Sequence, residues 1–228
     1  DLFLLIAAAA FLIGLICKVA GEREKDKRLT RADSFLLVTL SCVVSSVIGS
    51  IPYIFIAGMD VHSAFFESIS GFTTTGATCM MDVDAMPHDL LFWRSLTHWI
   101  GGIGIVVFSF ALIASYEMKS SNVFSAEVTG LGVDKLRPKI GDTARRLLLI
   151  YMFLTAVCAL CYWLGPMDTF DSVCHAMSTI ATGGFSTHTA SIGYFHSTYL
   201  EYVCSFFMIL SGVNFSLFYD ASIGRPAT

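Results

Sequence analysis

The chain has 228 residues, of which 55% are hydrophobic and only 14% are charged, and its mean hydropathy is +0.69. Soluble domains usually carry about 25% charged residues, so this composition excludes an ordinary water-soluble protein and indicates an integral membrane protein. The formal net charge of −4 is less informative than the placement of the charges, because placement reports orientation in a membrane.

Five apolar stretches are long enough to cross a bilayer, which requires roughly 20 helical residues. They are residues 2–19, 34–58, 92–116, 145–165 and 197–219. We therefore expect an all-α integral membrane fold with five transmembrane helices. The chain begins at Asp1 rather than at a methionine and ends without a closing element, so we also expect a piece of a longer protein.

The basic residues lie on one side of these stretches. Thirteen of the fourteen Lys and Arg residues follow the first, third or fifth stretch, and Arg94 is the exception. The segments 59–91 and 166–196 contain no Lys or Arg. Because cytoplasmic loops are enriched in Lys and Arg, we expect 20–33 and 117–144 to be cytoplasmic and the two Lys- and Arg-free segments to face outward.

The two outward segments are related by an offset of 108 residues. The aligned pairs include Asp60 with Asp168, Ser70 with Ser178, Thr74 with Thr182, Gly76 with Gly184 and Thr78 with Ser186. The flanking apolar stretches align under the same shift, which predicts two tandem repeats of helix, pore loop and helix. The expected divisions are an N-terminal helix with its basic loop (1–33), a first repeat (34–117), a cytoplasmic connector (118–144) and a second repeat (145–228).

Each outward segment combines a short helix with a strand rich in Thr and Gly. Residues 61–71 and 169–180 read as helices of about ten residues, or roughly 15 Å at 1.5 Å per residue, which is half the thickness of a bilayer. Irregular backbone at membrane depth is tolerated only where protein or a water-filled cavity surrounds it. We therefore predict two re-entrant loops beside an aqueous path.

The irregular strands predict a selectivity filter for a monovalent cation. A half-helix that enters from outside points its partially negative C-terminus at the membrane centre, and backbone carbonyls can replace the water shell of K⁺. Neither strand contains a charged residue, which favours carbonyl dipoles over a carboxylate ring. The expected filter residues are Thr73, Thr74, Thr75, Gly76, Ala77, Thr78, Ala181, Thr182, Gly183, Gly184, Phe185 and Ser186. Those expected to bind K⁺ are Thr74, Thr75, Thr182 and Gly183.

Three further residues are expected to support the filter. Glu67 lies on the first short helix and is expected to accept hydrogen bonds from loop amides; its counterpart under the offset is His175. Ser70 and Ser178 occupy equivalent positions one turn later. No set of residues has the spacing of a catalytic or metal site, so we expect no enzymatic activity.

Four stretches carry a resemblance to a known family. ESISGFTTTGAT (67–78) resembles the first pore loop of the TrkH/KtrB potassium uptake family, closest to TrkH, and STIATGGFSTH (178–188) resembles the second. HWIGGIG (98–104) resembles the start of the helix after the first loop, and DKLRPKIGDTARR (134–146) resembles the connection between the first two repeats. The resemblance covers almost the whole chain.

The resemblance implies a channel-like fold of four repeats in the cytoplasmic (inner) membrane, of which the third and fourth are absent here. It implies K⁺ as the transported ion, no cofactor on this chain, a homodimer, and a cytoplasmic nucleotide-binding regulatory partner of the TrkA type. In that family one glycine per loop is linked to K⁺ selectivity, and a serine at the first of them accompanies Na⁺ permeation in some plant relatives. By position these glycines are Gly76 and Gly184.

Alternatives remain for the function and for the extent of the protein. An ion-coupled secondary transporter would have breaks within full-length spans, whereas the breaks here follow half-length helices on one side only. A Na⁺-permeable member of the same family is disfavoured by the glycine at Gly76. A two-repeat protein that pairs to give four loops is the alternative to a fragment.

Overall fold

The computed structural model of the chain describes residues 31–105 and 137–213, together with scattered residues between 3 and 19. Most of the first predicted span, residues 20–30 and 117–136 of the segments expected to be cytoplasmic, the end of the third predicted span (106–116) and the end of the fifth lie outside the described residues. Every regular element within the described residues is a helix, which agrees with the predicted all-α class.

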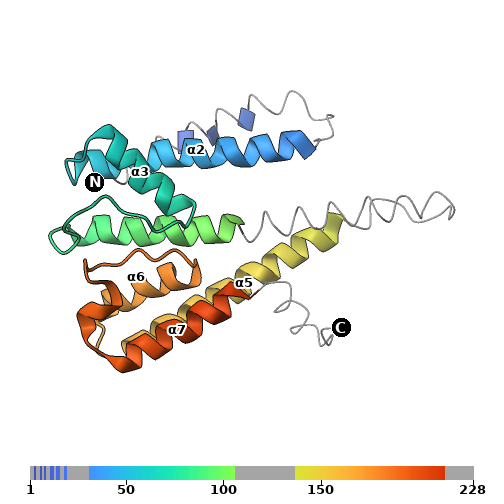
Figure 1. Cartoon of the computed structure of the whole chain (residues 1–228). Coiled ribbons are helices and arrows are strands. Elements are labelled where there is room, and N and C mark those ends of the chain that lie inside the picture. The colour runs from blue at the N-terminus through green and yellow to red at the C-terminus, as the bar shows by residue number, and fades with distance from the viewer. Residues whose placement is uncertain are drawn as a thin grey trace.

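Within residues 31–105 and 137–213, seven helical elements follow one another (Figure 1). They are α2 (Arg31–Phe55), α3 (Val61–Phe72), a helix that starts at 88 and reaches the end of the described segment at 105, α5 (Arg137–Trp163), α6 (Thr169–Ile180), the short 3-10 helix η3 (Ser191–Phe195) and α7 (Thr198–Gly212).

Two of these helices are long and apolar enough to cross a membrane. The segment Phe35–Phe55 of α2 has a mean hydropathy of 2.0, and Ala144–Trp163 of α5 has 1.8. They coincide with the second and fourth predicted spans. The fifth predicted stretch, 197–219, is not one continuous helix, because α7 ends at Gly212 and Val213 has extended backbone angles.

The short helices α3 and α6 match each other closely. Each has 12 residues, and α6 starts and ends 108 residues after α3. Each also begins after an aspartate, because the carboxylates of Asp60 and Asp168 accept backbone N–H groups of the first turn that have no partner within the helix. Twelve residues span roughly 18 Å, so neither helix can cross a bilayer core of about 30 Å.

Helix 88–105 lies between α3 and α6 (Figure 1). Two glycines allow this close packing. A Cβ atom on Gly101 would collide with the backbone of Phe72 at the end of α3, and one on Gly102 would lie 3.0 Å from Cα of Ala181 at the end of α6. The helix therefore touches the C-terminal ends of both short helices, as small residues permit in membrane proteins.

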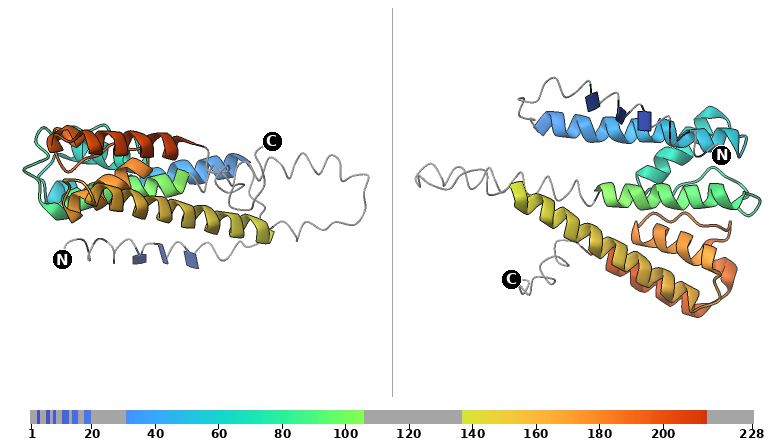
Figure 2. Two further views of the ribbon diagram at one scale, coloured as in Figure 1. Left: turned by 90° about the horizontal axis from the view of Figure 1, so that it is seen from below. Right: turned by 180° about the vertical axis from the view of Figure 1, so that it is seen from behind.

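Each half of the molecule has its own buried apolar cluster. In the first half Tyr53, Ala64 and Leu90 pack together from α2, α3 and helix 88–105. In the second half α5, α6 and α7 pack against one another (Figure 2). Their shared cluster comprises Tyr151, Leu154, Cys158, Tyr162, Met167, Ala176, Ile180, Leu200 and Phe207. The outer faces of α2, α5 and α7 expose many large apolar side chains, as expected of surfaces in contact with lipid.

Candidate functional site

Two irregular strands follow α3 and α6; we term residues 73–78 the first loop and 181–186 the second loop. Both loops have a positive φ at their second and fourth residues. The angles are 54° at Thr74, 74° at Gly76, 56° at Thr182 and 108° at Gly184. Positive φ is rare for a β-branched residue and costs of the order of 1–3 kcal/mol. A threonine in this conformation at the same place in both loops indicates a geometry that serves function rather than stability.

The loop carbonyls fall into two groups. Within the described residues, no hydrogen bond reaches the carbonyl oxygens of the four residues expected to bind K⁺, which are Thr74, Thr75, Thr182 and Gly183. In contrast, Ala77 O accepts a hydrogen bond from Ser70 Oγ at 2.6 Å, and Ala181 O accepts one from Thr182 Oγ1 at 2.7 Å. The first group accepts no hydrogen bond from the described residues, whereas the second is engaged by side chains.

The two loops approach each other at Gly76. A Cβ atom on this residue would collide with the carbonyl oxygen of Gly183 and lie 2.9 Å from its carbon. Gly183 in turn packs against the ring of His98, where a Cβ atom would also collide. A side chain at either position would therefore collide with a neighbour, and the two loops are in contact at Gly76 and Gly183.

Glu67 holds the C-terminal end of the first loop. Its side chain is fully buried, and Oε1 accepts hydrogen bonds from Thr78 Oγ1 at 2.5 Å and from the backbone N–H of Cys79 at 2.6 Å. Hydrogen bonds to a carboxylate are stronger than those between neutral groups. Glu67 thus contacts the last residue of the first loop, Thr78, and the backbone of the residue that follows it.

His175 makes the corresponding contact in the second loop. Its Nδ1 lies 2.8 Å from the carbonyl of Asp171, which assigns the proton of the neutral ring to Nδ1. Nε2 can then accept a hydrogen bond from Ser186 Oγ at 2.9 Å. Ser186 aligns with Thr78 under the 108-residue offset, so an imidazole and a carboxylate support corresponding hydroxyl groups.

Arg94, in the N-terminal half of helix 88–105, contacts both loops and was not predicted to do so. It is 1% exposed. Its Nη1 donates a hydrogen bond to the carbonyl of Ser186 at 3.0 Å, and its Nη2 donates one to Thr78 Oγ1 at 3.2 Å. The sequence carries one signal of this role, which is that Arg94 is the only basic residue outside the expected cytoplasmic side.

His98 lies one turn after Arg94 and contacts the second loop. Its Nδ1 is 2.9 Å from Ser178 Oγ, and its ring stacks on Phe185 with the centroids 4.0 Å apart. Ser178 Oγ also accepts a hydrogen bond from the backbone N–H of Gly184 at 3.2 Å. Ser178 therefore lies against the second loop, as expected for a supporting residue.

His188, which follows the second loop, contacts Asp84, which follows the first loop, and Asp171 of α6. His188 Nδ1 is 2.6 Å from Asp84 Oδ1, its Nε2 is 3.2 Å from Asp171 Oδ2, and Tyr194 stacks on its ring at 3.6 Å. Hydrogen bonds from His188 and Thr189 lower the pKa of Asp84 to about 2. Among the described residues no group of three His, Cys, Asp or Glu side chains is arranged to hold a metal ion.

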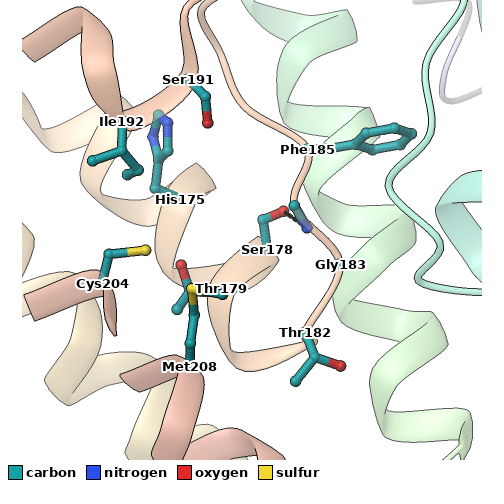
Figure 3. A pocket seen from close by; sticks show the side chains of 11 residues that line it. His175, Ser178, Thr179, Thr182, Gly183, Phe185, Ser191, Ile192, Cys204 and Met208 are labelled. Carbon is teal, nitrogen blue, oxygen red and sulfur yellow. Dashed lines mark hydrogen bonds between the residues drawn. The ribbon is translucent and has the colours of Figure 1, made fainter. Parts of the chain in front are cut away.

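A cavity of about 360 Å³ lies behind the second loop, between α6 and α7 (Figure 3). Thr182 and Gly183 form one side of it, and Cys204 and Met208 of α7 form another. Figure 3 shows the Phe185 ring directed away from the cavity, toward helix 88–105. The cavity is therefore on the side of the second loop that faces away from the first.

The sequence profile of the family described as TrkH, cation transport protein, matches residues 5–225. The Trk system potassium uptake protein TrkH of Escherichia coli K12 is 41% identical over 219 residues, which are 95% of this chain and 45% of that protein. TrkG of the same organism, also described as a Trk system potassium uptake protein, is 37% identical over 86% of this chain and 41% of its own length.

A solved structure is similar as well. The crystal structure of the potassium transporter TrkH from Vibrio parahaemolyticus superposes with a TM-score of 0.81 and 37% sequence identity, over 96% of this chain and 44% of that chain. The present chain thus spans less than half the length of each of these relatives.

Proposed function

Because the chain belongs to the TrkH family of cation transport proteins, we propose that it supplies two of the pore loops of a potassium uptake protein. Members of this family are transporters rather than enzymes. The transported K⁺ is then the substrate, and the chain itself needs no cofactor. The alternative of an ion-coupled transporter for another solute is disfavoured, because the irregular strands follow half-length helices rather than interrupting full-length spans.

The repeated backbone geometry of the two loops is the observation that carries the proposal. Both have positive φ at equivalent threonine and glycine positions, and both follow a half-length helix whose C-terminal end carries a partial negative charge. The open carbonyls of Thr74, Thr75, Thr182 and Gly183 offer the oxygen ligands that replace the hydration shell of K⁺. We assign K⁺ binding to these four residues.

Two loops do not close a ring around an ion, and α7 offers a surface for a further repeat. Under the 108-residue offset Tyr202 and Phe206 of α7 correspond to Arg94 and His98, which are buried against the second loop. Tyr202 and Phe206 are instead 74% and 60% exposed. We propose that a third repeat packs on this face and fills the adjacent cavity, and that a fourth repeat completes the pore.

The same proposal includes an orientation and partners. The loops face outward and the basic segments face the cytoplasm, as the positive-inside rule predicts. A cysteine introduced at Asp84 should react with an impermeant reagent from outside, whereas one at Lys25 should react only after permeabilisation; the reverse pattern would contradict this orientation.

The relatives belong to a Trk system, which implies further Trk components, and we propose a homodimer with a cytoplasmic TrkA-type regulatory subunit.

The function can be tested with the full-length protein that contains this chain, produced in bacteria that lack their own potassium uptake. We expect growth at low external K⁺ and uptake of radioactive rubidium, with much slower uptake of sodium. Equal rates for rubidium and sodium would instead favour a Na⁺-permeable member of the family. Absence of uptake of either cation, with the protein present in the membrane, would contradict the proposal.

A further inference from the structure

Arg94 is a buried cation in a part of the molecule where the sequence places no other basic residue. It is 1% exposed and lies on a helix flanked by both loops. An ionised side chain within a membrane protein is costly to bury unless its charge is paired and its donors are used. The surrounding residues must therefore offset the free-energy cost of burying the charge of Arg94.

Four groups around the guanidinium provide that compensation. The carboxylate of Glu67 faces it, with Oε2 3.5 Å from Nη2. The Ser186 carbonyl accepts from Nη1, and the Thr78 hydroxyl accepts from Nη2. The Phe185 ring lies below the group, with Cζ 4.1 Å from the ring centroid, which is a cation–π distance.

These contacts belong to different segments of the chain. Thr78 ends the first loop, Ser186 ends the second loop, and Glu67 lies on α3. One planar guanidinium therefore joins the outer ends of both loops. A lysine could not do the same, because a single ammonium on a flexible stem lacks the rigid fork that directs two donors to two separate acceptors.

The pairing also affects the field at the loops. Arg94 and Glu67 are both buried and carry opposite charges, so together they add no net charge beside the open carbonyls. If either were neutralised alone, the other would remain as an unpaired charge in a medium of low dielectric constant. A lone arginine would repel an approaching cation, and a lone glutamate would attract it.

We propose that Arg94 is a positioning residue for ion selectivity: it fixes the spacing of the two loops through Thr78 and Ser186, while Glu67 cancels its charge toward the permeating cation. The inference rests on the proposed transport function. It assigns the geometric role to the two hydrogen bonds of the arginine and the electrostatic role to the ion pair. These roles predict different effects of different substitutions.

The test uses the full-length protein with four variants, R94K, R94Q, E67Q and the double variant E67Q/R94Q, compared at equal amounts in the membrane. Rubidium and sodium uptake give the selectivity ratio, and the dependence of rubidium uptake on its concentration gives KM. R146Q is the matched control, because Arg146 is an exposed arginine on α5. It should leave both quantities unchanged.

R94K keeps the positive charge but loses the two fixed donors of the guanidinium. We expect its selectivity ratio to fall about tenfold, because hydrogen bonds to charged groups contribute the free energy of a tenfold change. Its KM should change by less than about threefold, because the charge is kept. E67Q leaves an unpaired cation and should raise KM about tenfold by the same reasoning. In E67Q/R94Q the KM should return toward the wild-type value, while selectivity stays as low as in R94Q. This separation of KM from selectivity is not expected of a residue that only stabilises the fold.

Unchanged selectivity in R94K and R94Q, with wild-type transport intact, would overturn the inference and leave the proposed function standing. A double variant whose KM is higher than that of E67Q would also overturn it, because the charges would then not compensate each other. If R94Q does not reach the membrane, R94K and E67Q alone decide the matter. Failure of the wild-type protein to transport rubidium would instead refute the proposed function.

Discussion

The first and second loops have the same backbone geometry but different supports. Positive φ occurs at equivalent residues in both, yet Glu67 supports Thr78 in one and His175 supports Ser186 in the other. A carboxylate only accepts hydrogen bonds, whereas an imidazole with its proton on Nδ1 accepts through Nε2. The loop geometry thus requires an acceptor at this position of the short helix and does not require a particular charge.

The neighbouring residues explain why Glu67 is a carboxylate and its counterpart His175 is an imidazole. Arg94 lies 3.5 Å from Glu67 Oε2, so the first loop has a counter-charge for a carboxylate. His175 is bounded by the Asp171 carbonyl and the Ser186 hydroxyl, and a carboxylate in its place would face a carbonyl oxygen. The two loops are therefore related by backbone and position, while each side-chain support is matched to its own neighbours.

The strongest way to break the equivalence is to substitute the two positive-φ glycines. Gly76→Ser adds a Cβ atom that collides with Gly183, whereas Gly184→Ser meets open space and suffers only backbone strain. We expect Gly76→Ser, which combines the collision with backbone strain, to lower the potassium-to-sodium ratio by about 100-fold. Gly184→Ser, with strain alone at the lower end of about 1–3 kcal/mol, should lower it by about tenfold.

Rubidium and sodium uptake by the full-length variants measures both effects. Gly193→Ser is the control, since a side chain there meets no atom within 4 Å and the residue has no positive φ. A larger effect of Gly184→Ser than of Gly76→Ser would show that strain outweighs the contact between the loops.

A second pair of substitutions tests the contacts of helix 88–105 with the C-terminal ends of α3 and α6, where the two loops begin. Gly101→Ala is directed at the backbone of Phe72, whereas Gly102→Ala meets Ala181 at 3.0 Å and the side-chain hydroxyl of Tyr151 at 2.6 Å. Overpacking costs about 1–3 kcal/mol, and we expect the larger loss of thermal stability for Gly101→Ala because a backbone cannot move aside. Melting of the detergent-solubilised full-length protein measures this, with Gly104→Ala in open space as the control.

Removing the supported hydroxyl groups gives a smaller effect and compares the two supports directly. Thr78→Val leaves the Glu67 carboxylate with one hydrogen-bond donor fewer, and Ser186→Ala leaves Nε2 of His175 without its partner. A hydrogen bond to a charged group contributes about 1.5–3 kcal/mol and a neutral one about 0.5–1.5 kcal/mol. The same melting experiment should therefore show the greater loss for Thr78→Val; equal losses would mean that charge contributes nothing to the first support.

The smallest expected effect concerns pH at the outer ends of the loops. The pKa of Asp84 is lowered from 3.8 to about 2, chiefly by the hydrogen bond with His188. Because a carboxylate with a lowered pKa stabilises the folded state above its unfolded pKa, this contribution is present at neutral pH and is lost as the pH falls from about 4 to about 2. Asp84 is solvent-exposed, so screening keeps the effect small.

Melting temperature against pH tests this in wild type and in Asp84→Asn, which should differ at pH 6 and converge near pH 2. Asp82→Asn is the control, because Asp82 is an exposed carboxylate whose only hydrogen bond is with Ala85 among the described residues. A constant difference between wild type and Asp84→Asn down to pH 2 would exclude the proposed linkage.

Local sequence was sufficient to predict the short helices. Asp60 and Asp168 mark where α3 and α6 begin, and capping depends only on residues within one turn. The predicted bounds 169–180 are those of α6, and α3 extends one residue beyond the predicted 61–71. The Thr- and Gly-rich composition indicated irregular strands for the same reason, since these residues disfavour helix.

Contacts between distant segments were not predictable from one sequence. Arg94 and Ser186 are 92 residues apart, and no periodic pattern relates them. The orientation of individual carbonyls was equally hidden, because it depends on the backbone angles of each loop residue. Ala77 belongs to the predicted filter by position, yet its carbonyl accepts a hydrogen bond from Ser70.

The aspartate caps of α3 and α6 have a consequence for the electric potential along an ion path. A helix has a partial positive charge at its N-terminus and a partial negative charge at its C-terminus. The carboxylates of Asp60 and Asp168 cover the positive ends, so the field of each short helix is dominated by its negative end. In the proposed pore, a cation that approaches past the caps would therefore meet a negative potential at both ends of each short helix rather than an uncovered positive helix end.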